Sequence, residues 1–142
     1  MRFEIRPYEG AGKLHFGMRA LEVKALLGEA SDSFFKIPSD ILASEQYETE
    51  NLFIYYKEPG NVEAIEFYPP AKVFLESREL FSLSCEELRR LLLKLDPDLE
   101  VEVDSLTSYR LGIGAYTPNA EEDSTLPAES IIAFEKGYYE EE

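Results

Sequence analysis

The chain has few of the residue types on which most enzyme sites depend. It contains no tryptophan, one cysteine (Cys85) and one histidine (His15). A single cysteine excludes an internal disulfide bond and a zinc site built from several cysteines. One histidine with no cysteine nearby forms neither a typical zinc motif nor a Ser-His-Asp set. We therefore expect no metal and no cofactor.

Positive charge is also scarce. The chain has 14 lysines and arginines against 29 aspartates and glutamates, which gives a net charge of −15. Because nucleic acids and anionic membranes are bound mainly through lysine and arginine, we expect neither as a partner. The acidic balance favours a basic protein partner, or it provides only solubility.

Long apolar segments are missing as well. No run of about 18 apolar residues is present, so we expect no transmembrane helix. The N-terminal MRFEIRPYEG lacks the apolar core of a signal peptide, so a cytoplasmic location is expected. A length of 142 residues with 44% hydrophobic residues suits one folded domain, 1–142.

Two segments have the apolar spacing of a helix. In residues 18–27 the apolar positions follow a helical period, and Gly28 stands where a left-handed C-terminal cap belongs. Residues 85–94 follow a capping box formed by Ser84 and Glu87, and their leucines recur on one face.

The remaining hydrophobic segments are typical of strands. Alternation and β-branched or aromatic residues predict strands at 2–6, 52–57, 62–68, 98–104, 108–117 and 130–136. The predicted fold is α+β, with two helices packed on a mostly antiparallel sheet.

The two halves of the chain echo one another. The apolar pattern of 16–27 recurs 65 residues later at 81–92, and 64–67 resembles 131–134. The halves 1–76 and 77–142 are therefore either tandem helix-plus-strands units or a chance periodicity of common residues.

A short motif resembles a known family. It consists of Phe16-Gly17-Met18, Glu22-Val23 and Leu26-Leu27-Gly28. These residues resemble the signature of the BamE and β-lactamase-inhibitor-protein-like superfamily. The resemblance implies helices on an antiparallel sheet, sometimes in tandem, with Met18, Val23 and Leu26 anchoring the helix. It also implies binding or assembly. Envelope members carry a lipoprotein leader that this sequence does not show, so an inhibitor or immunity-type protein is the nearer analogy.

The predicted strand 98–104 carries a row of carboxylates. Asp98, Glu100, Glu102 and Asp104 point to one face, because strand side chains alternate. Neighbouring carboxylates of the row are about 6.5–7 Å apart, too far to chelate one small metal ion. A regular exposed row also lacks the contrast of environments that acid/base catalysis uses. The row is either a solvated face or a docking face.

The next strand extends this candidate surface. If a hairpin forms through 105–108, Arg110 falls near Glu102, and Gly112 and Gly114 face outward in a flat strip bordered by Tyr116. The alternative is a β-bulge, or close packing against the first half. The candidate partner-binding residues are Asp98, Glu100, Glu102, Asp104, Arg110, Gly112, Gly114 and Tyr116.

These patterns favour a binding function. We expect a non-enzymatic acidic module of inhibitor or toxin-immunity type that docks a basic protein. One alternative is a small metal-dependent or carboxylate-based hydrolase, which requires carboxylates from separate segments to converge in a cleft. Another is a self-associating structural module, a homo-oligomer formed through an exposed apolar edge at 52–57 or 130–134.

Overall fold

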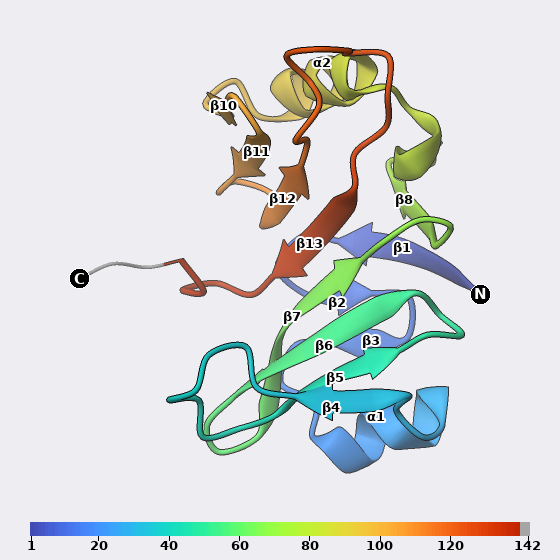
Figure 1. Ribbon diagram of the computed structural model, residues 1–142, viewed down its shortest axis with the longest axis vertical. Coiled ribbons are helices and arrows are strands. Elements are labelled where there is room, and N and C mark those ends of the chain that lie inside the picture. The colour runs from blue at the N-terminus through green and yellow to red at the C-terminus, as the bar shows by residue number, and fades with distance from the viewer. Residues whose placement is uncertain (140–142) are drawn as a thin grey trace.

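The computed structural model describes residues 1–139 and contains a large and a small β-sheet (Figure 1). Every neighbouring pair in the large sheet is antiparallel. Its eight strands follow the order β10 (Glu100–Glu102), β11 (Ser105–Ser108), β12 (Ile113–Tyr116), β13 (Ser130–Phe134), β7 (Asn61–Phe67), β6 (Leu52–Lys57), β5 (Ser44–Tyr47) and β4 (Asp32–Phe34).

Each half of the chain contributes four strands to the large sheet, and one helix precedes each set of four. Helix α1 (Ala20–Leu27) precedes β4–β7, and helix α2 (Cys85–Leu95) precedes β10–β13. The two sets meet where β7 pairs with β13, with Ile65 opposite Ala133. Figure 1 shows the two helices at opposite ends of the molecule. That 1–76 and 77–142 are copies of one unit stays a prediction.

The small sheet was not predicted. Its strands follow the order β3 (Leu14–His15), β2 (Gly10–Ala11), β1 (Arg2–Arg6), β8 (Lys72–Leu75) and β9 (Arg78–Glu79). The β1–β8 pair is parallel, with Phe3 opposite Val73. A short 3-10 helix, Leu80–Ser82, follows β9 and leads towards α2. Strands of two residues are too short to show alternation, so periodicity cannot predict them.

One face of the large sheet forms the main core with the small sheet and the helices. The rings of Phe3 and Phe67 lie 5.0 Å apart between the two sheets. Val23 of α1 and Leu88 and Leu92 of α2 are buried in the same cluster. The opposite face of the large sheet carries a second, smaller cluster built on Tyr55, Ala64 and Phe134.

The predicted fold class, two helices on one mostly antiparallel sheet, is wrong. Strands hold 37% of the residues and helices 16%, and there are two sheets, so the protein is mostly β. Helix α1 buries only Val23, whereas Leu26, an expected anchor, is exposed. The small sheet packs against the large sheet beside the helices, at a place that the prediction gave to the helices alone.

Several predicted elements are confirmed. Helix α2 begins at its capping box, in which the Glu87 amide donates to Ser84 Oγ over 3.1 Å and the Ser84 amide donates to Glu87 Oε1 over 2.9 Å. The strands predicted at 2–6 and 52–57 are β1 and β6. Among residues 1–139, no helix has the length and apolar character that crossing a membrane requires.

Candidate functional site

The carboxylate row lies on a hairpin that is tighter than predicted. Strand β10 covers only Glu100–Glu102, the chain turns at Val103 and Asp104, and the expected loop 105–108 is strand β11. Glu100 pairs with Thr107 and Glu102 with Ser105. Asp98 and Asp104 are exposed but lie outside the strand, so the continuous strand 98–104 is a wrong prediction.

Arg110 is not opposite Glu102. It follows β11, and its Nε lies 3.6 Å from Oδ1 of Asp96, the C-cap residue of α2. Asp96 is buried, accepts a 2.7 Å hydrogen bond from Ser108 Oγ and accepts another from the Asp98 amide at 2.9 Å. Asp96 therefore ties the base of the β10–β11 hairpin to the end of α2. The sequence indicates only that the helix ends at Asp96, before Pro97.

The two glycines are buried and do not form an exposed strip. Gly112 has a φ of +68°, and a Cβ there would lie 2.9 Å from the Phe134 carbonyl oxygen and 2.9 Å from Tyr8 Cε1. Gly112 therefore allows close packing against Tyr8 of the first half of the chain, which was the alternative to an exposed strip. Gly114 pairs with Thr107 and Ile132 and carries no side chain over the open face of the sheet.

Four predicted residues do line one cavity. We name this cavity the outer groove; it measures about 610 Å³ and lies on the sheet face opposite the main core. Glu100, Glu102, Gly114 and Tyr116 line it together with residues from distant segments. The most informative of these are Lys36, Tyr55, Glu66, Tyr109, Tyr138 and Tyr139.

Aromatic rings form one wall of the outer groove. Tyr138 stacks on Phe134 at 5.7 Å, and Tyr139 meets the same ring edge-on at 4.9 Å. Tyr55 donates a hydrogen bond of 2.5 Å to Glu66 Oε1. These residues come from β6, β7, β13 and the segment after β13, and sequence reasoning did not connect them.

A lysine ammonium already sits at this wall. Lys36 Nζ lies 4.2 Å from the centre of the Tyr55 ring and 5.7 Å from that of Tyr138. It also donates to the Tyr138 hydroxyl over 3.4 Å. An aromatic face attracts a cation through the ring quadrupole. The wall is therefore chemically suited to lysine or arginine side chains.

The hydroxyls of Tyr55 and Tyr138 have raised pKa values, so both stay protonated at neutral pH. Burial, with the nearby carboxylates of Glu63 and Glu66, raises the pKa of Tyr138 to about 12. Burial and the hydrogen bond to Glu66 raise the pKa of Tyr55 as well. These two tyrosines therefore act as neutral donors beside the carboxylates of the groove.

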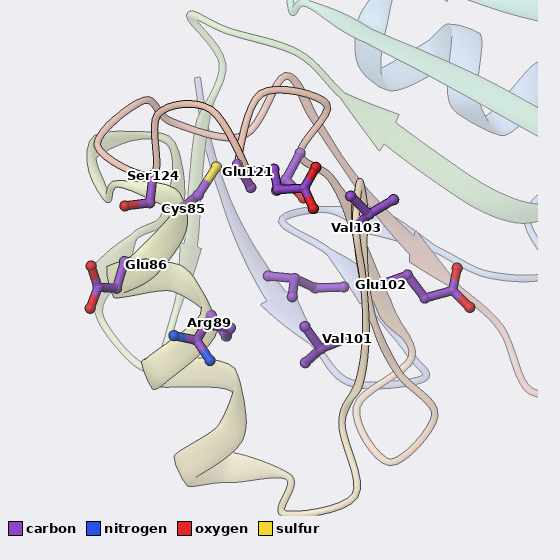
Figure 2. Close-up of a pocket in the computed structure, with 11 residues that line it drawn as sticks. Cys85, Glu86, Arg89, Val101, Glu102, Val103, Glu121 and Ser124 are labelled. Carbon is purple, nitrogen blue, oxygen red and sulfur yellow. The ribbon is translucent and has the colours of Figure 1, made fainter.

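A second cavity lies on the other side of β10. This inner cleft measures about 380 Å³ and separates the β10–β11 hairpin from the N-terminal part of α2 (Figure 2). Val101, Val103 and Leu106 line one side, and Cys85 and Arg89 line the other. Val101 is 48% exposed and Val103 is 60% exposed, so the strand's apolar face is only partly covered.

Cys85 is a free and buried thiol at the start of α2. Burial, with the Asp123 carboxylate, raises its pKa, which keeps it protonated. Within residues 1–139, no three histidine, cysteine, aspartate or glutamate side chains are grouped so that they could hold a metal ion.

The two segments named for self-association are interior strands. In the large sheet β6 lies between β5 and β7, and β13 lies between β7 and β12. Neither 52–57 nor 130–134 offers an exposed edge, so that form of the self-association hypothesis is wrong.

No protein-family model, curated protein or solved structure matches this chain. The resemblance to the BamE and β-lactamase-inhibitor-protein-like superfamily stays a prediction. The fold and the site by themselves define a two-sheet β protein with an acidic, tyrosine-walled groove on the outer face of its large sheet.

Proposed function

We propose that this protein is a non-enzymatic binding module that docks a basic protein partner in the outer groove. The observation that carries the proposal is the composition of the groove: the carboxylates of Glu66, Glu100 and Glu102 lie around tyrosines that already hold the Lys36 ammonium. Carboxylates and aromatic faces together are the groups that recognise lysine and arginine.

The edge of the groove carries charge that the chain does not neutralise. Glu100 and Glu102 are exposed, and in the described part of the chain neither forms an ion pair. The net charge of −15 adds a long-range field that speeds encounter with a basic protein. Among residues 1–139, Lys36 is the only cation lining the groove, which leaves room for a partner's positive charge.

An inhibitor or toxin-immunity protein of the cytoplasm is the specific form of this proposal. The short motif at 16–28 supports it through the family resemblance.

The test is affinity capture from a lysate of the source cell at low and at high salt, followed by mass spectrometry. We expect one basic protein that binds at low salt and is weakened at high salt, because salt screens exposed charges. The double variant Glu100→Lys with Glu102→Lys should abolish the capture.

The matched control is Glu4→Lys with Glu76→Lys. Both glutamates are exposed and lie on or beside the small sheet, and the double variant changes the net charge by the same amount. It should retain the partner. Capture that survives reversal of Glu100 and Glu102, or that the control loses equally, would show that the outer groove is not the docking site. Capture of nothing at either salt would contradict the proposed function.

A further inference from the structure

We propose that the partner binds as an additional strand along β10, through an extended segment in which basic residues alternate with aliphatic ones. This inference rests on the proposed function, because it takes the partner to be basic. It adds the mode of binding and the residue pattern that is recognised.

Strand β10 is the terminal strand of the large sheet. It pairs with β11 on one side, and its other edge pairs with no strand among residues 1–139. All three of its residues are exposed. The main-chain groups of an edge strand can pair with a strand from another protein, a mode that secures affinity through the backbone.

The two faces of β10 differ in chemistry, and each face borders one cavity. Glu100 and Glu102 line the outer groove, and Glu102 also borders the inner cleft. Val101 lines the inner cleft only, and it pairs with Leu106 of β11. Figure 2 shows Val101 on the side of Cys85 and Arg89, while Glu102 points away from α2. The alternation that stands out in the sequence thus places Glu100 and Glu102 on the outer groove and Val101 on the inner cleft, whose far side also carries Glu86 and Arg89.

An added strand would repeat this alternation, because successive side chains of a strand point to opposite faces. Its residues on the outer face would lie beside Glu100 and Glu102, where lysine or arginine forms favourable cross-strand pairs. Its residues on the inner face would lie beside Val101 and cover the inner cleft. Aliphatic side chains there would remove from water the apolar surface that Val101 and Val103 now expose.

Charge distinguishes this occupant from a second copy of the chain. Pairing two β10 edges would place Glu100 and Glu102 of one copy beside the same carboxylates of the other. Like charges in neighbouring strand positions are destabilising. The edge of β10 is therefore complementary in charge to a basic strand, and it repels the same edge of a second copy.

The test uses synthetic peptides with a fluorescent label. The probe has the core Lys-Val-Lys-Val-Lys between glycines, and a control of equal composition has the core Lys-Lys-Val-Val-Lys. Two further forms of the probe carry N-methyl groups on alternate residues. One form is methylated at the lysines of the core, and the other is methylated at the valines. Because N-methylation removes amide donors from one edge of the peptide, one of these two forms cannot pair with β10.

Binding is measured by fluorescence anisotropy. We expect the probe to bind, and the composition control and one N-methylated form to bind about tenfold or more weakly. On the protein, Val101→Pro should weaken binding to a similar extent, since proline removes an amide from an edge position that tolerates it. Val101→Thr keeps the amide but reduces the apolar surface, so it should bind more weakly than the unaltered protein and more tightly than Val101→Pro.

Circular dichroism establishes that both Val101 variants fold, and the peptide series needs no change to the protein. Absence of binding by the probe would overturn the inference. Equal binding by the composition control and by both N-methylated forms would overturn it too. In either case the proposed function would stand if Glu100→Lys with Glu102→Lys still abolished capture of the natural partner. Capture that survives that double variant would instead refute the proposed function.

Discussion

Gly112 is a residue at which both backbone conformation and packing oppose a side chain. Its φ of +68° is in the left-handed region, and its Cα faces the Phe134 carbonyl and the Tyr8 ring. The Tyr8 hydroxyl donates to the Tyr109 carbonyl oxygen in the same turn. This contact joins the first strand pair to the β11–β12 turn across the molecule.

We expect Gly112→Ala to destabilise the fold by more than the roughly 1–2 kcal/mol that a left-handed alanine costs. The excess comes from the close approach of the new methyl group to Phe134 and Tyr8. The free energy of unfolding in urea measures it. Gly17→Ala is the matched control, since Gly17 has a φ of +95° but no atom within 4 Å of the position that a new methyl group would take. Equal losses in the two variants would show that packing at Gly112 contributes nothing.

At the residue scale, sequence could identify only part of the outer groove. Glu100 and Glu102 were evident because their alternation is local. Tyr55, Glu66 and Tyr138 were not, because they come together through the pairing of β6, β7 and β13. The prediction that Gly112 faces outward was wrong for the same reason, because its neighbour Tyr8 is more than a hundred residues away in the sequence.

Helix α2 is the element whose sequence signals were most complete. Its capping box satisfies two main-chain donors, and its leucines face the core. The carboxylate of Glu87 has a lowered pKa because it accepts the Ser84 amide hydrogen bond. Both ends of α2 are held, the second through Asp96.

We expect Ser84→Ala to lower stability by about 1 kcal/mol, the usual loss for removing a serine N-cap. The amide of Glu87 would lose its acceptor at a helix end that other chain segments also contact. Thermal unfolding followed by circular dichroism measures the change. Ser39→Ala, at an exposed loop serine, should leave the transition unchanged. An equal loss of stability in Ser39→Ala would show that the N-cap does not account for the effect of Ser84→Ala.

The elements that sequence missed lacked a local signal. Strands β2 and β9 have two residues each, and tertiary pairing alone defines them. The hairpin turn at Val103 and Asp104 was hidden because alternation continues through it and no glycine or asparagine marks it. Because the chain turns earlier than predicted, Glu102 pairs with Ser105 and not with Arg110.

Charge is the dominant property of the whole molecule. With a net charge of −15, the folded chain repels itself, and few of its carboxylates lie in ion pairs within residues 1–139. Composition predicted this property without any knowledge of the fold. The antiparallel character of the main sheet was also predictable from hairpin signals, whereas the second sheet was not.

We expect sodium chloride to stabilise the fold, because screening weakens this repulsion. Between low salt and about 0.5 M, a gain of about 1 kcal/mol corresponds to a rise in Tm of roughly 3–5 °C. Differential scanning fluorimetry measures the rise. Glu100→Lys with Glu102→Lys makes the chain less negative and should show a smaller rise. A Tm that falls with salt would mean that the ion pairs outweigh the repulsion.

The join between β7 and β13 at the middle of the large sheet has a consequence for folding kinetics. Every contact across that join links residues more than sixty positions apart, such as Ile65 and Ala133. Closing so long a loop carries an entropic cost that must be met before the contacts stabilise the chain, which slows the folding of sheets rich in such pairs. During synthesis, β6 and β7 can pair as a local hairpin, but β7 remains an uncovered, apolar edge until β13 arrives. The strand that completes the sheet is therefore also the one that protects the nascent chain from aggregation.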